Sequence, residues 1–270
     1  MTSSRIEPPS ASADRRAIPL VEPVETPHQR GLDSLDRRES ALPLVLAVHG
    51  TRSALGTRTS MELAEAVAIA TGADVRLGWV DIHTPTLTDT LRELGEAIVV
   101  PAFLTGGYHV TSDIPAAITA AGGLATATPL IGADVLPAVL DRLDAVGDFD
   151  AVVVAGAGSL RPRAVAEVRA VTRELSRAVD SPALAGFVTA ASPTVPKAVA
   201  MLRASGHRRV AIASYLLAPG RFSEQLDEAG ADAVSEPIGV HPLLVRAIAD
   251  RWRAAVSQPL TASHPKAVND

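Results

Sequence analysis

The chain has 270 residues, of which 47% are hydrophobic and 20% are charged, and its lack of cysteine excludes disulfides, thiolate metal sites and cysteine-bound iron–sulfur clusters. The formal net charge of −5 and the aromatic content of 3% provide neither the basic surface nor the stacking side chains typical of nucleic-acid-binding proteins. No apolar run approaches the roughly 20 residues of a membrane span, and the N-terminus lacks the apolar core of a secretory signal, so we expect a cytoplasmic protein with a small-molecule partner and no membrane or nucleic-acid partner.

The two ends of the chain differ in composition from its middle. Residues 1–40 are rich in proline, serine, arginine and acidic residues without an apolar period, which predicts a disordered N-terminal arm, and residues 259–270 predict a flexible tail. Between them, short apolar runs alternate with amphipathic helical stretches. This alternation is typical of βα units that form a parallel sheet.

The first half of this middle region predicts four strands and four helices. In chain order they are strand 43–48, helix 60–71, strand 75–80, helix 86–94, strand 97–103, a helix that begins at Asp113, strand 124–128 and helix 133–145. A capping box of Thr59 and Glu62 predicts the start of the first helix, and Gly72 and Gly95 predict the ends of the first two. Asp113 is most simply interpreted as an N-cap.

The second half repeats this order. Its predicted elements are strand 150–155, helix 162–179, strand 184–189, helix 194–205, strand 209–215, helix 222–229, strand 232–236 and helix 241–256. We therefore expect an α/β protein of two tandem, similar domains, each with a four-stranded parallel sheet flanked by helices. The predicted boundaries are residues 41–147 for the N-terminal domain and 148–258 for the C-terminal domain.

The repeat is also visible residue by residue. The matching segments are GWVDIHTPTL (78–87) with GFVTAASPTV (186–195), VVPAFLTGGYH (99–109) with AIASYLLAPGR (211–221), and TPLIGADVL (128–136) with EPIGVHPLL (236–244). Two domains of the same topology are expected to face one another and to form a cleft at their interface.

Three polar residues of the first half have no counterpart in the second. When the two halves are aligned, His49 aligns with Ala157, Asp81 with Thr189 and His109 with Arg221. The loss of all three side chains from a preserved scaffold indicates a site that belongs to the first domain alone.

The positions of these residues place them at one edge of the predicted sheet. His49 ends the first strand, Asp81 ends the second, and His109 follows the third on the glycine loop TGGYH. Ligands of open α/β sheets bind outside the carboxyl ends of the strands. Two imidazoles and one carboxylate suit Fe(II), Co(II), Ni(II) or Zn(II) and leave coordination positions open. His83 is either a spare ligand or a turn residue beside Pro85, and Gly106 and Gly107 have backbone N–H groups that could bind an anion.

Three segments resemble a known family. VLAVHGTR, VVPAFLTGGYHVTSDIP and VAIASYLLAPGRF are similar to the sirohydrochlorin chelatases, the class II chelatases of siroheme and cobalamin biosynthesis, over roughly residues 42–257. The likeness is to the two-domain form, in which the first half bears the active site. It implies insertion of Fe(II) or Co(II) into the tetrapyrrole sirohydrochlorin in the cytoplasm, without ATP and without a permanently bound cofactor.

The resemblance also implies roles for individual residues. His49 and His109 would be the metal-binding and catalytic histidines, and Asp81 stands where family members often have glutamate. Because sirohydrochlorin bears many carboxylates, Arg52 and Arg221 are the expected substrate-binding arginines. Ni(II) and Zn(II) are expected as further metals in vitro, and the sequence does not choose between iron and cobalt.

Two other functions remain open from the sequence. The same three polar residues would serve a non-catalytic carrier of metal or tetrapyrrole. Phosphoryl transfer by His49 ranks lower, because histidine phosphatases carry an arginine immediately before the histidine and this chain has Val48 there. The sequence leaves the oligomeric state open, a monomer included.

Overall fold

The computed structural model describes residues 42–257, so the predicted N-terminal arm and C-terminal tail lie outside the described residues. The elements of the first half of the sequence are β1 (Leu44–Val48), α2 (Ala54–Thr71), β2 (Val75–Trp79), α3 (Leu87–Leu94), β3 (Ile98–Pro101), a π-helical turn (His109–Asp113), α4 (Ile114–Ala120), β4 (Thr126–Ala127), a 3-10 turn (Gly132–Val135) and α5 (Leu136–Asp144). Those of the second half are β5 (Ala151–Gly156), α6 (Pro162–Ala178), β6 (Ala183–Phe187), α7 (Val195–Ala204), β7 (Val210–Tyr215), α8 (Arg221–Asp227), β8 (Ala233–Val234) and α9 (Pro242–Val256).

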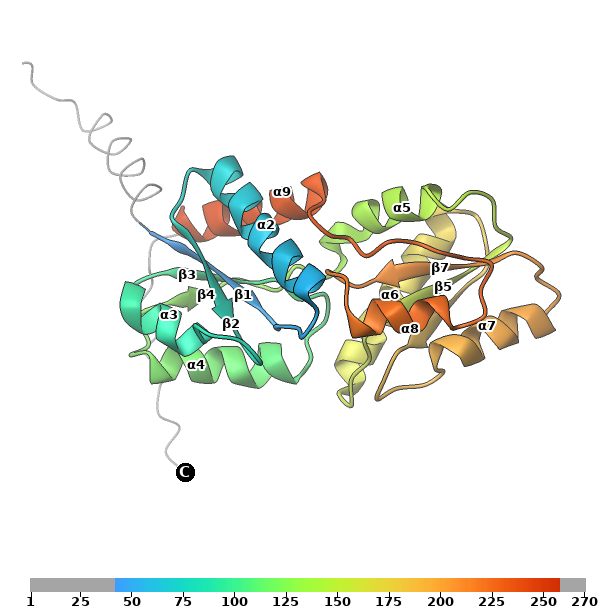
Figure 1. Cartoon of the computed structure of the whole chain (residues 1–270), viewed down its shortest axis with the longest axis horizontal. Coiled ribbons are helices and arrows are strands. Elements are labelled where there is room, and N and C mark those ends of the chain that lie inside the picture. The colour runs from blue at the N-terminus through green and yellow to red at the C-terminus, as the bar shows by residue number, and fades with distance from the viewer. Residues whose placement is uncertain (1–41, 258–270) are drawn as a thin grey trace, which may run out of the picture.

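These strands form two four-stranded parallel sheets, which confirms the predicted fold class (Figure 1). The strand orders are β2-β1-β3-β4 and β6-β5-β7-β8, so the two sheets share one topology. The central strands β1 and β5 read LVLAV and AVVVAG and are buried along their whole length. Continuous apolar runs of this kind are typical of parallel strands covered by helices on both faces.

Alternate residues of β1 face opposite helix layers. Leu44 and Leu46 belong to a core cluster that includes side chains of α2 and α9, whereas Val45 and Ala47 pack with Leu91 of α3 and with α4. The period of two along a strand separates these two sets of side chains. In the first sheet, therefore, α2 and α9 cover one face, and α3 and α4 cover the other.

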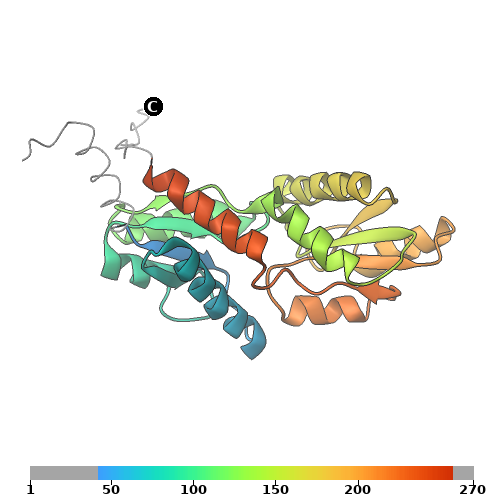
Figure 2. The ribbon, with the colours of Figure 1, turned by 90° about the horizontal axis from the view of Figure 1, so that it is seen from above.

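The last helix of each sequence half packs on the sheet of the other half (Figures 1 and 2). Helix α9, from the end of the chain, lies against α2 and β3, where the Trp252 indole N–H donates to the Leu42 carbonyl at 3.3 Å. Helix α5 lies against β7, and the Arg142 guanidinium donates to the Ile238 carbonyl at 2.9 Å. Each spatial half of the molecule thus contains one helix from the other half of the sequence, an exchange that the boundaries 41–147 and 148–258 do not describe.

Most predicted helix ends are confirmed to within about a residue, but the start of α2 is not. The predicted capping box of Thr59 and Glu62 is wrong. Ser53 caps the helix instead, because its side chain accepts the Gly56 N–H at 3.3 Å and the following residues continue the helix. Thr59 is buried in the second turn, where its hydroxyl donates to the Leu55 carbonyl. Within residues 42–257, no helix is long and apolar enough to cross a membrane.

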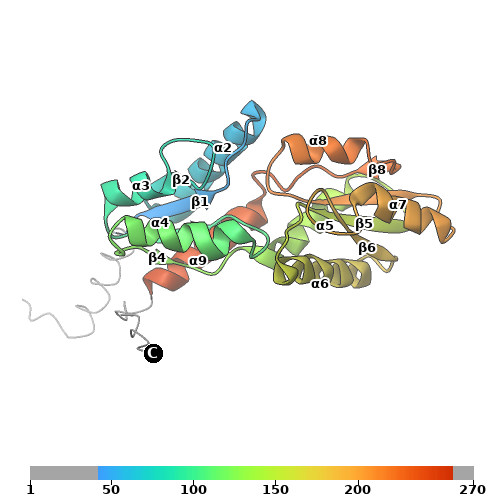
Figure 3. The ribbon, with the colours of Figure 1, turned by 90° about the horizontal axis from the view of Figure 1, so that it is seen from below.

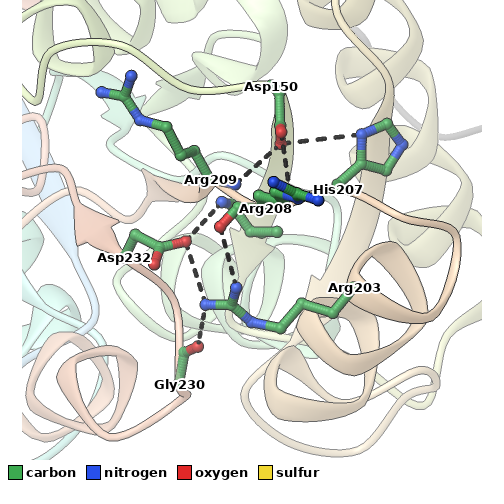
Figure 4. Close-up of polar contacts among 8 residues, drawn as sticks. Asp150, Arg203, His207, Arg208, Arg209, Gly230 and Asp232 are labelled. Atoms are coloured by element: carbon green, nitrogen blue, oxygen red, sulfur yellow. Dashed lines mark hydrogen bonds and ion pairs between the residues drawn. The ribbon is translucent and has the colours of Figure 1, made fainter.

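A polar cluster joins the amino ends of β5, β7 and β8 (Figure 4). The Asp150 carboxylate accepts the backbone N–H groups of Arg208 at 2.9 Å and Arg209 at 3.1 Å. The Asp232 carboxylate accepts the Val210 N–H at 2.7 Å and pairs with Arg203 at 3.1 Å. These carboxylates tie the turn before β7 to its two neighbouring segments.

Replacing Asp150 by alanine is expected to lower the thermal unfolding temperature at pH 7, and this loss should shrink in acid. The Arg208 N–H, with smaller effects of the Arg209 N–H and His207, lowers the pKa of Asp150 below its usual 3.8. A lowered pKa contributes stability above pH 3.8, and this contribution disappears as the pH falls through the folded-state pKa. Thermal melting from pH 7 to pH 3 would test this. Asp148→Ala is the control, since among the described residues that carboxylate contacts only the Arg209 side chain. An equal fall in unfolding temperature in both variants would contradict the prediction.

Candidate functional site

His49 lies at the carboxyl end of the buried strand β1. Its backbone carbonyl accepts the Asp81 N–H at 3.0 Å, which continues the β1–β2 ladder by one residue, while its imidazole is exposed to solvent. The next residue must be glycine, because Gly50 has φ +94° and a Cβ there would lie 2.2 Å from the Asp81 carbonyl oxygen. The sharp turn at Gly50 therefore presents His49 at the edge of the sheet.

His109 begins the π-helical turn that follows the loop after β3. Its Nδ1 lies 2.6 Å from the Asp113 carboxylate, and both side chains are about one third exposed. Helical spacing places residues i and i+4 on one face, so the turn itself brings these two groups together. Asp113 precedes α4 at the N-cap position, as predicted, but its carboxylate makes no capping bond to the α4 backbone and instead accepts the His109 Nδ1–H.

The structure brings His49 and His109 together, as the sequence predicted. Their ring centroids are 4.4 Å apart and the rings are nearly perpendicular, at 85°. His49 Nδ1 donates to the Gly50 carbonyl at 3.0 Å, and His109 Nδ1 donates to Asp113. A neutral imidazole that donates from Nδ1 has its lone pair on Nε2. Each ring therefore offers one Nε2 that can bind a cation or accept a proton.

Asp81 does not join this pair in the structure. Its carboxylate accepts the N–H of the next residue, Ile82, at 2.8 Å and is exposed. Across residues 42–257, no group of three or more histidine, aspartate or glutamate side chains is arranged to hold a metal ion. The observed arrangement is thus a two-histidine pair, and Asp81 as a third ligand stays a prediction.

His83 supports the loop that follows His49. Its Nε2 contacts the Thr51 carbonyl and lies 3.4 Å from the Thr57 hydroxyl, and its ring packs on Trp79 with a centroid distance of 4.7 Å. Of the two interpretations left open by the sequence, these contacts favour the structural one. His83 belongs to a separate groove of about 590 Å³ between α2 and α3.

The backbone of the glycine loop already binds a carboxylate group of the protein itself. The Gly106 N–H donates to the Glu167 carboxylate of α6 at 2.7 Å, and the Gly107 N–H donates to the Thr105 carbonyl at 2.9 Å. Neither N–H is therefore available in this structure for the external anion that the sequence suggested. Glu167 was not predicted, because 61 residues separate it from Gly106 and it lies on an ordinary amphipathic helix.

The predicted arginines belong to segments on the facing sides of the two sheets, where the start of α2 lies opposite the start of α8 (Figure 3). Arg52 lies in the loop between β1 and α2, and Arg221 is the first residue of α8. These two segments are close together, since a Cβ at Gly220 would lie 3.2 Å from the Thr51 hydroxyl oxygen. Both arginine side chains are exposed, and neither forms an ion pair or hydrogen bond with another residue between 42 and 257.

Exposed apolar side chains also follow the carboxyl ends of five strands. The loops after β1, β2, β3, β5 and β7 each carry or lead into one: Leu55, Ile82, Tyr108, Leu160 and Phe222. Large exposed apolar side chains grouped around one place are typical of a binding surface. The two imidazoles thus lie at a junction with both apolar and cationic groups in the surrounding loops.

Replacing Asp113 by alanine is expected to weaken Co(II) binding by about 10- to 100-fold, because the carboxylate fixes the His109 ring and its tautomer. Titration of the metal-free protein with Co(II), followed by visible absorption, measures this. Asp144→Ala, at the exposed end of α5, is the control and should bind as the unaltered protein does. Unchanged affinity in Asp113→Ala would show that this carboxylate does not support a metal ligand.

Comparisons with known proteins give a consistent result. The CbiX family model matches residues 43–137 and 151–255. A sirohydrochlorin cobaltochelatase of Methanococcus maripaludis is 35% identical over 78 residues, which are 27% of this chain and 54% of that protein, so the match spans about half of the relative's length. The structure of SirB from Bacillus subtilis with Fe3+ has a TM-score of 0.67 and 22% identity, covering 80% of this chain and 96% of SirB.

Another solved structure is also similar to this chain. CbiX, described as the terminal enzyme for biosynthesis of siroheme in denitrifying bacteria, has a TM-score of 0.59 and 23% identity, covering 79% of this chain and 99% of that one. At these identities the likeness establishes the fold. Both structures align with most of this chain, so the two-sheet architecture as a whole is shared.

Proposed function

Since the chain belongs to the CbiX family of sirohydrochlorin chelatases, matched in both of its halves, we propose that it inserts Fe(II) or Co(II) into sirohydrochlorin. The observation that carries this proposal is the pair of imidazoles of His49 and His109. Their centroids are 4.4 Å apart, and each has its Nδ1 occupied by a hydrogen bond. Such a pair is suited to bind a divalent ion and to release it.

Binding of the metal substrate is assigned to the two Nε2 atoms. Imidazole nitrogen is a suitable ligand for Fe(II) and Co(II), and two protein ligands leave most coordination positions open. Open positions matter here because the ion has to move to the four nitrogens of a macrocycle. A site that surrounded the ion with protein ligands would retain it.

Proton removal is assigned to the same histidines. Insertion replaces two pyrrole N–H protons by one divalent ion, so two protons have to leave the ring. Imidazole accepts protons near neutral pH, and the Asp113 carboxylate, 2.6 Å from Nδ1, stabilises the imidazolium that forms on His109. We therefore propose that each Nε2, once the ion has left it, is able to accept a proton from the macrocycle.

Binding of the macrocycle is assigned to the surrounding loops. Its carboxylates suit the exposed guanidinium groups of Arg52 and Arg221, which form bidentate hydrogen bonds with such groups. Its flat apolar surface suits the exposed side chains of Tyr108 and Phe222. The substrate would thus contact both halves of the molecule.

Anaerobic absorption spectroscopy of sirohydrochlorin with Co(II) or Fe(II) tests the proposal. The protein is expected to accelerate the spectral change of metal insertion over a protein-free control, and the faster metal identifies the preferred substrate. If the macrocycle or the metal bound without any acceleration, the protein would be a carrier and the proposed enzymatic function would be wrong.

A further inference from the structure

The loop that carries His109 is held by side chains of the second sequence half. The Tyr215 hydroxyl at the end of β7 donates to the Leu104 carbonyl at 3.2 Å. The Glu167 carboxylate of α6 accepts the Gly106 N–H at 2.7 Å. Tyr215 is almost fully buried, at 2% exposed, so the first of these bonds is shielded from water. Both bonds lie within five residues of His109.

A third side chain from the second half reaches the other end of the loop. Arg161, the residue before α6, donates to the Ser112 hydroxyl at 3.1 Å. Its guanidinium also lies over the Tyr108 ring, 5.5 Å from the ring centroid. An arginine over an aromatic ring is favourable through the ring quadrupole. His109 therefore lies between two residues that contact the same guanidinium.

Glu167 is the most specific of these three contacts. A Cβ at Gly106 would lie 3.4 Å from its Oε1, an ordinary van der Waals distance, so the carboxylate lies directly against the loop backbone. Arg163, one helical turn earlier, lies 3.4 Å from the same oxygen and helps to fix the carboxylate. A hydrogen bond to an ionised acceptor is stronger than one between neutral groups.

The loop needs such support because of its composition. Two consecutive glycines, Gly106 and Gly107, precede the Tyr108–His109 pair, and glycine has more backbone freedom to lose than any other residue. A catalytic group misplaced by about 1 Å can cost on the order of 100-fold in rate. Without external contacts, the glycines would let the His109 ring move away from His49.

We propose that Glu167, with Arg161 and Tyr215, positions His109 for metal transfer. The second half has Ala157 and Arg221 where the first has His49 and His109, and it acts on the reaction through this loop. Between residues 42 and 257, these three side chains hydrogen-bond to Gly106, Ser112 and Leu104 and not to the imidazole itself, so they are positioning residues and not catalytic ones. The expected effect on kcat rests on the proposed function. The position of the His109 ring, in contrast, can be measured without any substrate.

The first test compares Glu167→Ala with Glu167→Gln. The glutamine oxygen can accept the same Gly106 N–H, whereas alanine cannot. We expect kcat for Co(II) insertion to fall about 10- to 100-fold in Glu167→Ala, the rate equivalent of one lost hydrogen bond to a charged group, and less than about threefold in Glu167→Gln. Glu174→Ala, on an exposed position of the same helix, is the matched control with an unchanged kcat.

The second test measures the ring ¹⁵N and ¹H signals of His109 by NMR in the metal-free protein. We expect them to shift or broaden in Glu167→Ala and to stay unchanged in Glu167→Gln and Glu174→Ala. Tyr215→Phe removes only the hydroxyl bonded to Leu104 and should change the same signals. The test therefore still gives a result if one of the two variants fails to fold.

The two tests separate failure of the inference from failure of the function. If the unaltered protein does not accelerate metal insertion, the proposed function is wrong, and the His109 signals still test the positioning. If Glu167→Ala and Tyr215→Phe keep the His109 signals and the kcat of the unaltered protein, the positioning role is overturned. A loss of kcat that Glu167→Gln does not restore would also contradict it.

Discussion

Replacing His109 by alanine is expected to lower kcat for metal insertion by about 10²- to 10⁴-fold, the usual contribution of a positioned acid–base group. The variant loses one of the two proposed metal ligands, the imidazole whose Nδ1 lies 2.6 Å from the Asp113 carboxylate. His49→Ala removes the other half of the pair and should have an effect of the same order. If the two rings act as a unit, as proposed, kcat of the double variant should be little lower than kcat of either single variant.

The measurement is the anaerobic absorption assay with saturating Co(II) and with the sirohydrochlorin concentration varied up to saturation, which gives both kcat and KM. His207→Ala is the matched control, because this imidazole lies near Asp150 in the polar cluster at the amino ends of the second sheet. Wild-type rates in both His49→Ala and His109→Ala would assign the chemistry to other residues. A loss confined to KM for the macrocycle would make the pair a binding site and not a catalytic one.

Replacing Trp252 by alanine is expected to lower the free energy of unfolding by about 3–5 kcal/mol, the usual cost of removing a large buried aromatic side chain. Trp252 is 2% exposed, and its indole N–H donates to the carbonyl of Leu42, two residues before β1. Although it lies near the end of the chain, it completes the core of the first sheet. Urea unfolding followed by circular dichroism gives the free-energy change.

The part of the structure that the Trp252→Ala substitution destabilises can be tested as well as the change in the free energy of unfolding. Hydrogen exchange should show weakened protection of the amides of β1 and β3 before those of β5. Arg246→Ala, on the exposed side of α9 with 77% of its side chain accessible, should change the free energy of unfolding by less than about 0.5 kcal/mol. Loss of protection mainly in β5 would contradict the packing of α9 on the first sheet.

The strands and most helices could be predicted from the sequence, because their signals are local. The LVLAV run identifies β1, and the glycines at residues 72 and 95 identify the ends of α2 and α3. The exchange of α5 and α9 could not be predicted in this way. An amphipathic helix shows that one of its faces is buried, but the pattern does not say which sheet buries it. The start of α2 was missed because Thr59 and Glu62 imitate a capping box within a continuing helix.

Those parts of the candidate site that depend on local sequence signals could also be predicted. Strand ends are local features, so His49 and the loop of His109 could be placed at one edge of the sheet. The His109–Asp113 spacing of four residues was a usable signal for their contact, but aspartate before a helix is most often an N-cap. The contact of Gly106 with Glu167 joins residues far apart in the sequence, and no local pattern encodes it.

The exchange of terminal helices also bears on how the chain acquires its structure during synthesis. One face of the first sheet is covered in part by residues 242–256, which leave the ribosome almost 100 residues after α5. Until then the core of the first half is incomplete, and folding is expected to finish only after α9 emerges. Contacts between such distant segments also slow folding, because a long loop has to close before they form. The two halves are therefore expected to reach their final structure together, late in translation, and not one after the other.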